Sequence, residues 1–370
     1  MEHAAIARQR IQNQLVGAEK GADPAAVVRW MGAMQAQDYG QVVWAVGLRT
    51  QVPSRLAVEQ AVADKTVVLT WLMRGTIHFA SAEDTMWLVK LFGPRLLAAA
   101  GTRRKQLELD QGVINQSKAL FYEALHGGQP LTRSALMQLL EQAGIRTNGQ
   151  RGYHLLWSLA LEGFLCFGPR QATEQTFVLL EEWVPNARNL SREESLAELA
   201  ARYFTSHGPA TLHDFAGWLG LPVAEARQGL EAIHASLSAE KTAGKTLWMP
   251  ATPTIASPIA RLYLLPGFDE YFLGYKDRSA VVATEYLHKI CPRQNGVFKP
   301  MVVVDGQIAG TWSRKINKSS IDFTANFFLQ TQVTQQEVTE AAEQYCHFWG
   351  LPLGSVTLHE SHPGSAAQSG

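Results

Sequence analysis

The spacing of apolar side chains predicts that the chain begins with helices. Within residues 3–16 and again within residues 24–36, apolar positions recur near helical spacing among polar ones. Further helices are expected over residues 41–48 and 55–63. A group of helices therefore precedes the first predicted strand.

A predicted β-hairpin follows these helices. Residues 66–73 and 76–80 have the composition of strands, joined across Arg74 and Gly75. Helices followed by a hairpin make a winged helix, a fold that presents one helix to a DNA groove and its wing to the DNA backbone. The same order recurs twice, without obvious self-similarity of sequence. The predicted helices of these repeats span residues 115–126, 132–143, 149–163, 191–206, 211–219 and 222–235, and their strands lie around residues 165–168, 176–180 and 246–249.

The sequence becomes β-rich from Arg261 onward. Residues 301–312 predict a hairpin through Asp305 and Gly306, which suit a two-residue turn, and a helix over residues 333–348 closes the fold. We therefore expect an α+β fold of tandem winged helices with a C-terminal β-rich subdomain. The expected domains are residues 1–110, 111–188 and 189–258 for the three winged helices, 259–356 for the β-rich subdomain with a DNA-contacting hairpin, and 357–370 for a disordered tail.

The composition is that of a soluble globular protein. Apolar residues make up 46% and charged residues 18% of the 370 residues. No charged and then apolar leader opens the chain, and no apolar run reaches about 18 residues, so we expect a cytoplasmic protein without a membrane partner. Cys166, Cys291 and Cys346 are far apart, which argues against iron–sulfur and zinc sites of the usual spacing. We expect no metal and no cofactor.

The charge balance is unusual for a nucleic-acid binder. The chain has 33 Lys and Arg against 33 Asp and Glu, so it lacks a global basic excess. Affinity for DNA would have to come from a local basic surface. Candidates are residues 103–105 and the cluster of Arg314, Lys315 and Lys318, although such short clusters are also typical of a solvated surface.

Two glutamines, Gln35 and Gln37, flank Ala36 at the end of the second helical pattern. Residues two apart do not share a face of an α-helix, so the amides converge on one target only if the backbone leaves helical geometry between or just after them. The turn-prone Asp38 and Gly40 supply such a break. Two amides can hold a water molecule or a sugar edge without net charge. Taken alone, the pair is also typical of ordinary polar residues at a helix end.

Three segments, taken together and in order, add to this pattern. They are Gln35-Ala36-Gln37-Asp38-Tyr39-Gly40, Thr70-Trp71-Leu72-Met73-Arg74-Gly75-Thr76-Ile77-His78 and Leu264-Leu265-Pro266-Gly267-Phe268-Asp269-Glu270-Tyr271-Phe272-Leu273-Gly274-Tyr275-Lys276-Asp277-Arg278. In combination they resemble the AlkZ-like family of bacterial DNA glycosylases, over about residues 5 to 355. The resemblance implies tandem winged helices that form a C shape around DNA.

The resemblance also implies that Gln35 and Gln37 are catalytic, because a glutamine-apolar-glutamine motif carries the reaction in this family. Some relatives have Asp at the second position and prefer simpler lesions. This chain has Gln at both positions, like the members that unhook bulky or cross-linked adducts. The implied partner is double-stranded DNA with alkylated or cross-linked purines. We expect a nucleoid-associated monomer that serves base excision repair or resistance to a genotoxin.

Neutral amides suit the chemistry of this reaction. Alkylation at N7 of guanine makes the base a neutral leaving group, so the glycosidic bond breaks toward an oxocarbenium-like sugar. The remaining tasks are to place water at the anomeric carbon and to stabilise the developing cation, which amide oxygens do by position and dipole. We assign no proton abstraction to Gln. A cross-linked base cannot rotate fully out of the duplex, which favours an open cleft.

Five residues are candidates for DNA contact. Arg74 and His78 lie on the first predicted wing, and Trp312, Arg314 and Lys315 lie on a hairpin of the β-rich part. Each has a structural alternative: a solvated cation, a hydrogen-bonded histidine or a core tryptophan. In the third segment, a buried ion-pair network that braces the last winged helix against the β-rich part explains the polar residues at least as well as catalysis does. These residues are Asp269, Tyr275, Asp277 and Arg278.

Two other functional classes remain open. A winged-helix transcription regulator or DNA-binding module without catalysis is the main alternative, although a regulator has no need of Gln35 and Gln37 and is commonly a short dimer. A glycosidase that acts on sugars outside DNA would need two carboxylates that face a pocket. The strongest acidic cluster is Asp269 with Glu270.

Overall fold

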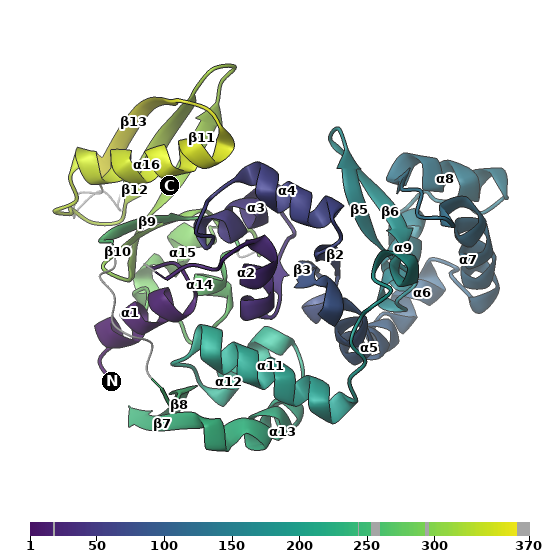
Figure 1. Ribbon diagram of the computed structural model, residues 1–370, viewed down its shortest axis with the longest axis horizontal. Helices are drawn as coiled ribbons and strands as arrows, with labels where there is room; N and C mark the ends of the chain where they lie inside the picture. Colours follow the sequence, from purple (N-terminus) through teal and green to yellow (C-terminus); the bar gives the residue numbers. More distant parts are fainter. Residues whose placement is uncertain (18, 243, 253–259, 293–295, 361–370) are drawn as a thin grey trace, which may run out of the picture.

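The computed structural model describes the chain except residues 18, 243, 253–259, 293–295 and 361–370. The first unit occupies the centre of the molecule, between the other two winged helices and the C-terminal part (Figure 1). Its helices are followed by a hairpin, as predicted. Its elements are α1 (His3–Asn13), α2 (Pro24–Met31), β1 (Met34–Gln35), α3 (Tyr39–Leu48), α4 (Arg55–Ala63), β2 (Val67–Trp71), β3 (Ile77–Ser81) and α5 (Ala82–Ala99).

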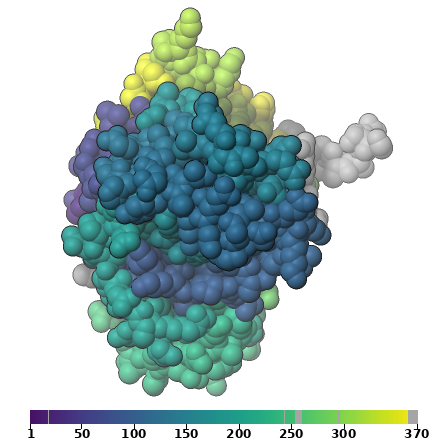
Figure 2. All heavy atoms as spheres, turned by 90° about the vertical axis from the view of Figure 1, so that its right-hand side faces the viewer, coloured from purple at the N-terminus to yellow at the C-terminus, as the bar shows by residue number. Residues whose placement is uncertain are grey.

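The second unit repeats this order but shares its sheet with the first. β2 and β5 pair at Leu69 and Phe167, which gives one six-stranded sheet in the order β1-β3-β2-β5-β6-β4. The sheet therefore crosses the boundary predicted at residue 110. Figure 2 shows the second unit in blue, covering the face toward the viewer. Its elements are α6 (Gly101–Gln106), α7 (Gln111–Leu125), β4 (Leu131–Thr132), α8 (Arg133–Gln142), α9 (Arg151–Leu161), β5 (Leu165–Gln171), β6 (Glu174–Leu179) and α10 (Leu180–Trp183).

The third unit is a three-helix group with its own two-stranded wing. The helices α11 and α12 begin with capping boxes at Ser191 and Thr211. The strand predicted at 246–249 has a partner at 237–242, which the hydrophobic pattern missed because these residues are mostly polar and exposed. Its elements are α11 (Arg192–His207), α12 (Leu212–Leu219), α13 (Val223–Ile233), β7 (Leu237–Thr242) and β8 (Lys245–Pro250).

The C-terminal subdomain is built on a five-stranded sheet in the order β13-β12-β11-β10-β9. Asp305 and Gly306 turn between β10 and β11 with positive φ angles of 51° and 82°, which confirms the predicted hairpin. The hairpin of β11 and β12 projects from the top of the molecule (Figures 1 and 2). The elements are β9 (Leu262–Leu265), α14 (Glu270–Leu273), α15 (Leu287–Ile290), β10 (Met301–Val304), β11 (Gln307–Ile316), β12 (Ile321–Phe327), α16 (Gln335–Trp349) and β13 (Leu353–Glu360).

The C-terminal strand corrects the prediction of a disordered tail from residue 357. β13 runs parallel to β12 as far as Glu360, because its backbone completes the edge of the five-stranded sheet. The rest of the expected tail, residues 361–370, lies outside the described residues. Within the described residues, no helix is long and apolar enough to cross a membrane.

A buried ion pair joins the first unit to the C-terminal subdomain. Arg49 donates to both carboxylate oxygens of Asp269, at 2.9 and 2.8 Å, and neither side chain is exposed. Arg49 also donates to the backbone carbonyls of Gln14 and Ala45. The ion-pair alternative for Asp269 is therefore confirmed, although its partner lies in the first unit.

Other polar residues of the same segment contact the third unit. The Tyr275 hydroxyl donates to the backbone carbonyl of His207 at 2.7 Å, and Asp277 pairs with Lys245 at 2.5 Å. Arg278 instead donates to the carbonyl of Phe272 within its own segment. The segment therefore braces two units at once.

We expect Arg49→Met to destabilise the fold by about 3–5 kcal/mol, because it leaves the Asp269 carboxylate buried without its partner. Denaturant unfolding followed by circular dichroism measures this loss. Arg55→Met is the matched control, because Arg55 forms a partly exposed pair with Glu59, and its loss should cost less than about 1 kcal/mol. Equal losses in the two variants would contradict the structural importance of the buried pair.

Candidate active site

Gln35 ends the short strand β1 and Gln37 lies in the bend that follows it, which corrects their expected place at a helix end. α2 stops at Met31, because Gly32 takes a positive φ of 82°, a conformation that glycine adopts readily. β1 then pairs with β3, with Gln35 opposite His78. The chain leaves helical geometry before the two glutamines, and both line one cavity of about 590 Å³.

Both amide groups remain available to a ligand. The Gln35 side chain is half-buried, and its amide has no hydrogen-bond partner among the described residues. Gln37 is exposed, and its Oε1 lies 3.5 Å from the backbone nitrogen of Ile77, at the limit of a hydrogen bond. The pair can therefore bind a water molecule or the polar edge of a substrate.

The cavity is locally basic although the chain is neutral overall. Arg74, Lys276 and Arg278 line it, whereas no Asp or Glu does among its described lining residues. Phe268 and Phe298 supply apolar surface. A concave surface of one charge sign attracts the opposite charge, so this cavity suits a phosphate-bearing ligand.

Arg74 is held at the edge of this cavity by the third unit. It occupies the turn between β2 and β3 with a positive φ of 58°, and its Nη1 donates to the backbone carbonyl of Trp218. Its other N–H groups have no partner in the described part of the chain. Arg74 therefore keeps donors for a phosphate, and its predicted DNA contact remains open.

His78 and Trp312 are buried, which corrects the prediction that they contact DNA. His78 is 0% exposed, its Nδ1 lies 2.9 Å from the carbonyl of Thr76, and burial lowers its pKa to about 4. Trp312 is 2% exposed, and its Nε1 donates to the carbonyl of Leu265 at 2.7 Å. Both faces of β3 are buried and Trp312 lies on the buried face of β11, so the structural alternatives hold for both residues.

The two neighbouring cations of β11 have different surroundings. Arg314 is half-buried, with its guanidinium carbon 5.2 Å from the ring centroid of Tyr345 and 5.8 Å from that of Trp349. Lys315 is exposed. The basic run at residues 103–105 lies on α6 and does not line the glutamine cavity. Arg314 and Lys315 therefore remain, with the cavity cations, candidates for phosphate contact among the described residues.

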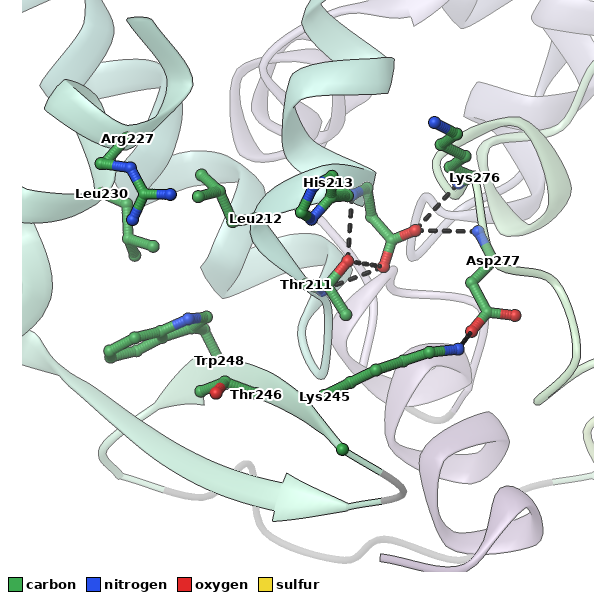
Figure 3. A pocket seen from close by; sticks show the side chains of 12 residues that line it. Thr211, Leu212, His213, Arg227, Leu230, Lys245, Thr246, Trp248, Lys276 and Asp277 are labelled. Carbon is green, nitrogen blue, oxygen red and sulfur yellow. Dashed lines mark hydrogen bonds and ion pairs between the residues drawn. The ribbon is translucent and has the colours of Figure 1, made fainter. Parts of the chain in front are cut away.

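A second cavity, of about 720 Å³, lies in the third unit. Figure 3 shows Arg227 and Leu230 of α13 facing Trp248 of the wing across it. Lys276 lines both this cavity and the glutamine cavity. Lys276 therefore lies between the glutamine cavity and a second cavity that also contains Asp214 and Asp277.

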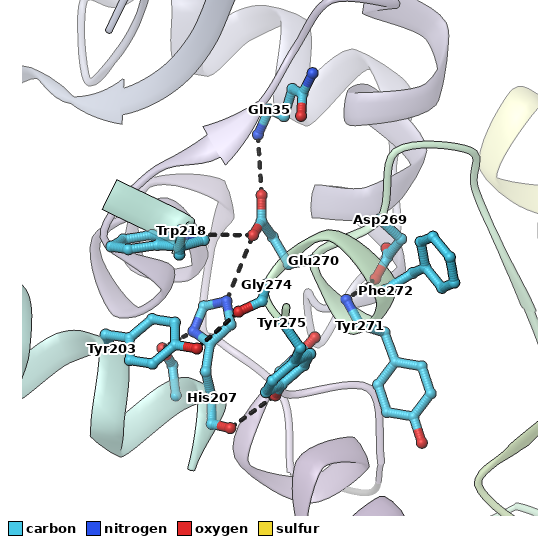
Figure 4. Close-up of polar contacts among 12 residues, drawn as sticks. Gln35, Tyr203, His207, Trp218, Asp269, Glu270, Tyr271, Phe272, Gly274 and Tyr275 are labelled. Carbon is cyan, nitrogen blue, oxygen red and sulfur yellow. Dashed lines mark hydrogen bonds and ion pairs between the residues drawn. The ribbon is translucent and has the colours of Figure 1, made fainter. Parts of the chain in front are cut away.

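Behind the glutamine cavity lies a buried polar cluster that sequence reasoning missed. Glu270 is 1% exposed and contacts Gln35, Trp218 and His207 (Figure 4). Burial by itself would raise the pKa of Glu270, but the adjacent His207 and the nearby Arg74 guanidinium hold the pKa below its usual value. An acidic residue among the apolar residues of the third segment was the available signal, since a charge there must be paired.

Comparison with known proteins agrees with this architecture. Residues 28–348 match the model of a family described as DNA glycosylase AlkZ-like. The chain belongs to the AlkZ-like DNA glycosylase family. A relative from Streptomyces sahachiroi, described as an interstrand DNA cross-link repair glycosylase, is 26% identical in an alignment 326 residues long that covers 82% of this chain and 85% of the relative. The solved structure of Streptomyces sahachiroi DNA glycosylase AlkZ superposes with a TM-score of 0.81 at 23% identity, over 97% of this chain and 99% of that one.

The AlkZ-like fold is therefore that of tandem winged helices, as the sequence predicted. In the described part of this AlkZ-like chain, no group of three or more His, Cys, Asp or Glu residues is placed to hold a metal ion. The catalytic roles of Gln35 and Gln37 and the DNA contacts of Arg74, Arg314 and Lys315 stay predictions.

The buried His78 gives a prediction on pH. Its pKa of about 4 in the folded chain lies below the ordinary histidine pKa of 6.5, so the unfolded chain binds more protons between these two pH values. The free energy of unfolding should therefore fall by about 3 kcal/mol from this group as the pH drops from 6.5 to 4. Denaturant unfolding at several pH values should show a weaker pH dependence in His78→Asn.

The control is His288→Asn, because His288 is exposed. This variant should keep the pH dependence of the wild type. A His78→Asn variant with an unchanged pH dependence would mean that His78 titrates alike in the folded and unfolded chains.

Proposed function

We propose that this AlkZ-like glycosylase hydrolyses the N-glycosidic bond of N7-alkylated purines in double-stranded DNA, including bulky adducts and interstrand cross-links. The observation that carries the proposal is the convergence of Gln35 and Gln37 on one basic cavity. Their amides supply oriented dipoles, and Arg74, Lys276 and Arg278 supply the positive charge that phosphates require.

The proposed chemistry needs no side-chain base. A cationic N7-alkylated base leaves as a neutral group, so catalysis reduces to placing water at the anomeric carbon and stabilising the developing positive charge on the sugar. The carbonyl oxygens of Gln35 and Gln37 suit both tasks, because each accepts a hydrogen bond from water and carries the negative end of its amide dipole. No carboxylate lines the cavity among its described residues, which disfavours a glycosidase mechanism with two acids.

Activity on cross-links is supported by two observations. The relative from Streptomyces sahachiroi carries cross-link repair in its description. This chain also has glutamine at both positions of the motif, as in the members that the sequence resemblance associates with bulky lesions. The role in base excision repair or in genotoxin resistance, and action as a monomer, remain part of this proposal.

The duplex is proposed to contact the exposed hairpin of β11 and β12 as well as the cavity. Lys315 is exposed on this projecting hairpin, and Arg314 lies beside it. The guanidinium of Arg314 comes close to Gly40, since a Cβ placed there would lie 3.8 Å from its Nη2. The hairpin is thus adjacent to the start of α3, which follows the glutamine pair, and one duplex can touch both.

The first test is base release. Gln35→Ala and Gln37→Ala should each lower the single-turnover rate of N7-methylguanine release from alkylated duplex DNA by about 100-fold, the scale of losing one preorganised dipole. The Kd for the duplex should change by less than about threefold, because neither residue carries charge. Gln51→Ala, an exposed glutamine outside the cavity, is the control.

The contrary outcomes differ in meaning. Parallel losses of rate and affinity would remove the two glutamines from the chemical step. DNA binding without base release by the wild type, on methylated and cross-linked substrates alike, would favour the non-catalytic DNA-binding module.

The second test is the salt dependence of DNA binding. Lys315→Ala should weaken binding and reduce the slope of log Kd against log salt concentration by about one, because one fewer phosphate is neutralised. Lys90→Ala is the control, since Lys90 is exposed on α5 and hydrogen-bonds to Asn189. An unchanged slope for Lys315→Ala would exclude this lysine from the DNA contact.

A further inference from the structure

Glu270 satisfies a backbone group that the six-stranded sheet leaves without a partner. In an antiparallel strand, successive N–H groups point alternately toward and away from the neighbouring strand. Ala36 donates to Ile77 of β3 at 2.7 Å, so the N–H of Gln35 points toward the free edge of the sheet. Glu270 Oε1 accepts this N–H at 3.2 Å. The carboxylate thus takes the place of a further strand.

The same carboxylate is held from the third unit. Its Oε2 accepts from Trp218 Nε1 of α12 at 2.9 Å and lies 3.5 Å from His207 Nε2 of α11. Figure 4 shows these contacts converging on Glu270 from one side, with Gln35 on the other. Trp218 and His207 are 1% and 0% exposed. Because rigid helices carry both partners, the position of the Gln35 backbone is tied to the third winged helix.

We propose that Glu270 is a positioning residue for base excision, which fixes β1 and the residues that follow it so that the amides of Gln35 and Gln37 both face the cavity. The inference rests on the proposed function. Glu270 does not line the cavity, so it acts through the strand and does not touch substrate. Reaction geometry is sensitive to such support, since a displacement of about 1 Å can slow a reaction by about 100-fold.

The Glu270→Gln variant isolates this role. A carboxylate has two acceptor oxygens and can serve Gln35 and Trp218 together, whereas an amide has one and must turn its NH₂ group toward one of these donors. Asp84→Asn is the matched control. Asp84 is also a fully buried carboxylate, accepts from Trp87 Nε1 at 2.9 Å and pairs with Arg202 at 2.6 Å, but its hydrogen bonds and ion pairs do not reach residues 35–37.

Two measurements on the full-length chain test the proposal. Hydrogen exchange followed by mass spectrometry should show faster deuterium uptake at residues 32–38 in Glu270→Gln and wild-type uptake there in Asp84→Asn. Single-turnover release of N7-methylguanine at saturating protein should slow by about 10- to 100-fold in Glu270→Gln, while the Kd for the duplex changes by less than about threefold. Asp84→Asn should release base at the wild-type rate even if its Tm falls as far as that of Glu270→Gln.

A double variant shows whether Glu270 acts through the strand. Glu270→Gln should slow base release by a smaller factor in a Gln35→Ala background than in the wild type. The two effects should not add, because both changes disturb one element. Trp218→Phe keeps an aromatic ring but removes one donor to Glu270. Trp218→Phe should also raise deuterium uptake and slow base release, each by a smaller factor than Glu270→Gln does. It replaces Glu270→Gln in the test if that variant does not fold.

Each contrary result is distinct. Unchanged uptake at residues 32–38 in Glu270→Gln overturns the proposal, whatever the enzyme does. Faster uptake with an unchanged rate, or a rate loss shared equally by Asp84→Asn, also overturns it. If the wild type releases no base, the proposed function fails, and the exchange result still decides whether Glu270 holds the strand.

Discussion

The strand that ends at Gln35, two residues before Gln37, is only two residues long and lies at the edge of its sheet, so it cannot be held by strand pairing alone. One neighbour, β3, binds it from one side. On the other side a buried carboxylate accepts the outward N–H of Gln35. The Glu270 carboxylate is 1% exposed, so it must find its donors within the protein. The geometry of the site therefore depends on a side chain from the C-terminal subdomain.

Two adjacent acidic residues divide this structural task. Asp269 is bound by Arg49 of the first unit, whereas Glu270 is bound by Trp218 of the third. The four-residue helix α14 that begins here therefore fastens three parts of the chain at one place. Buried charges persist only when they are paired, so each of these contacts also specifies how the units sit against one another.

The electrostatics of the cavity explain how a neutral chain can suit an anionic partner. The Lys and Arg residues equal the Asp and Glu residues in number, yet the described lining of the glutamine cavity holds three cations and no acid. The anionic Glu270 lies behind the cavity, where its carboxylate accepts hydrogen bonds from the backbone of Gln35 and from Trp218. Net charge describes the solubility of the whole chain, whereas attraction of phosphate depends on the local arrangement.

The sequence by itself determined most elements and the family, because periodic helices, the Asp305-Gly306 turn and the ordered segments are local signals. Only the tertiary structure decided the rest. Gly32 ended a helix that the apolar pattern extended to residue 36, and strand pairing put His78 and Trp312 in the core. Glu270 became a partner of Gln35 across 235 positions of sequence, and β2 joined β5 across a predicted boundary. Contacts of this kind depend on which elements meet in space, and no local pattern of residues records that.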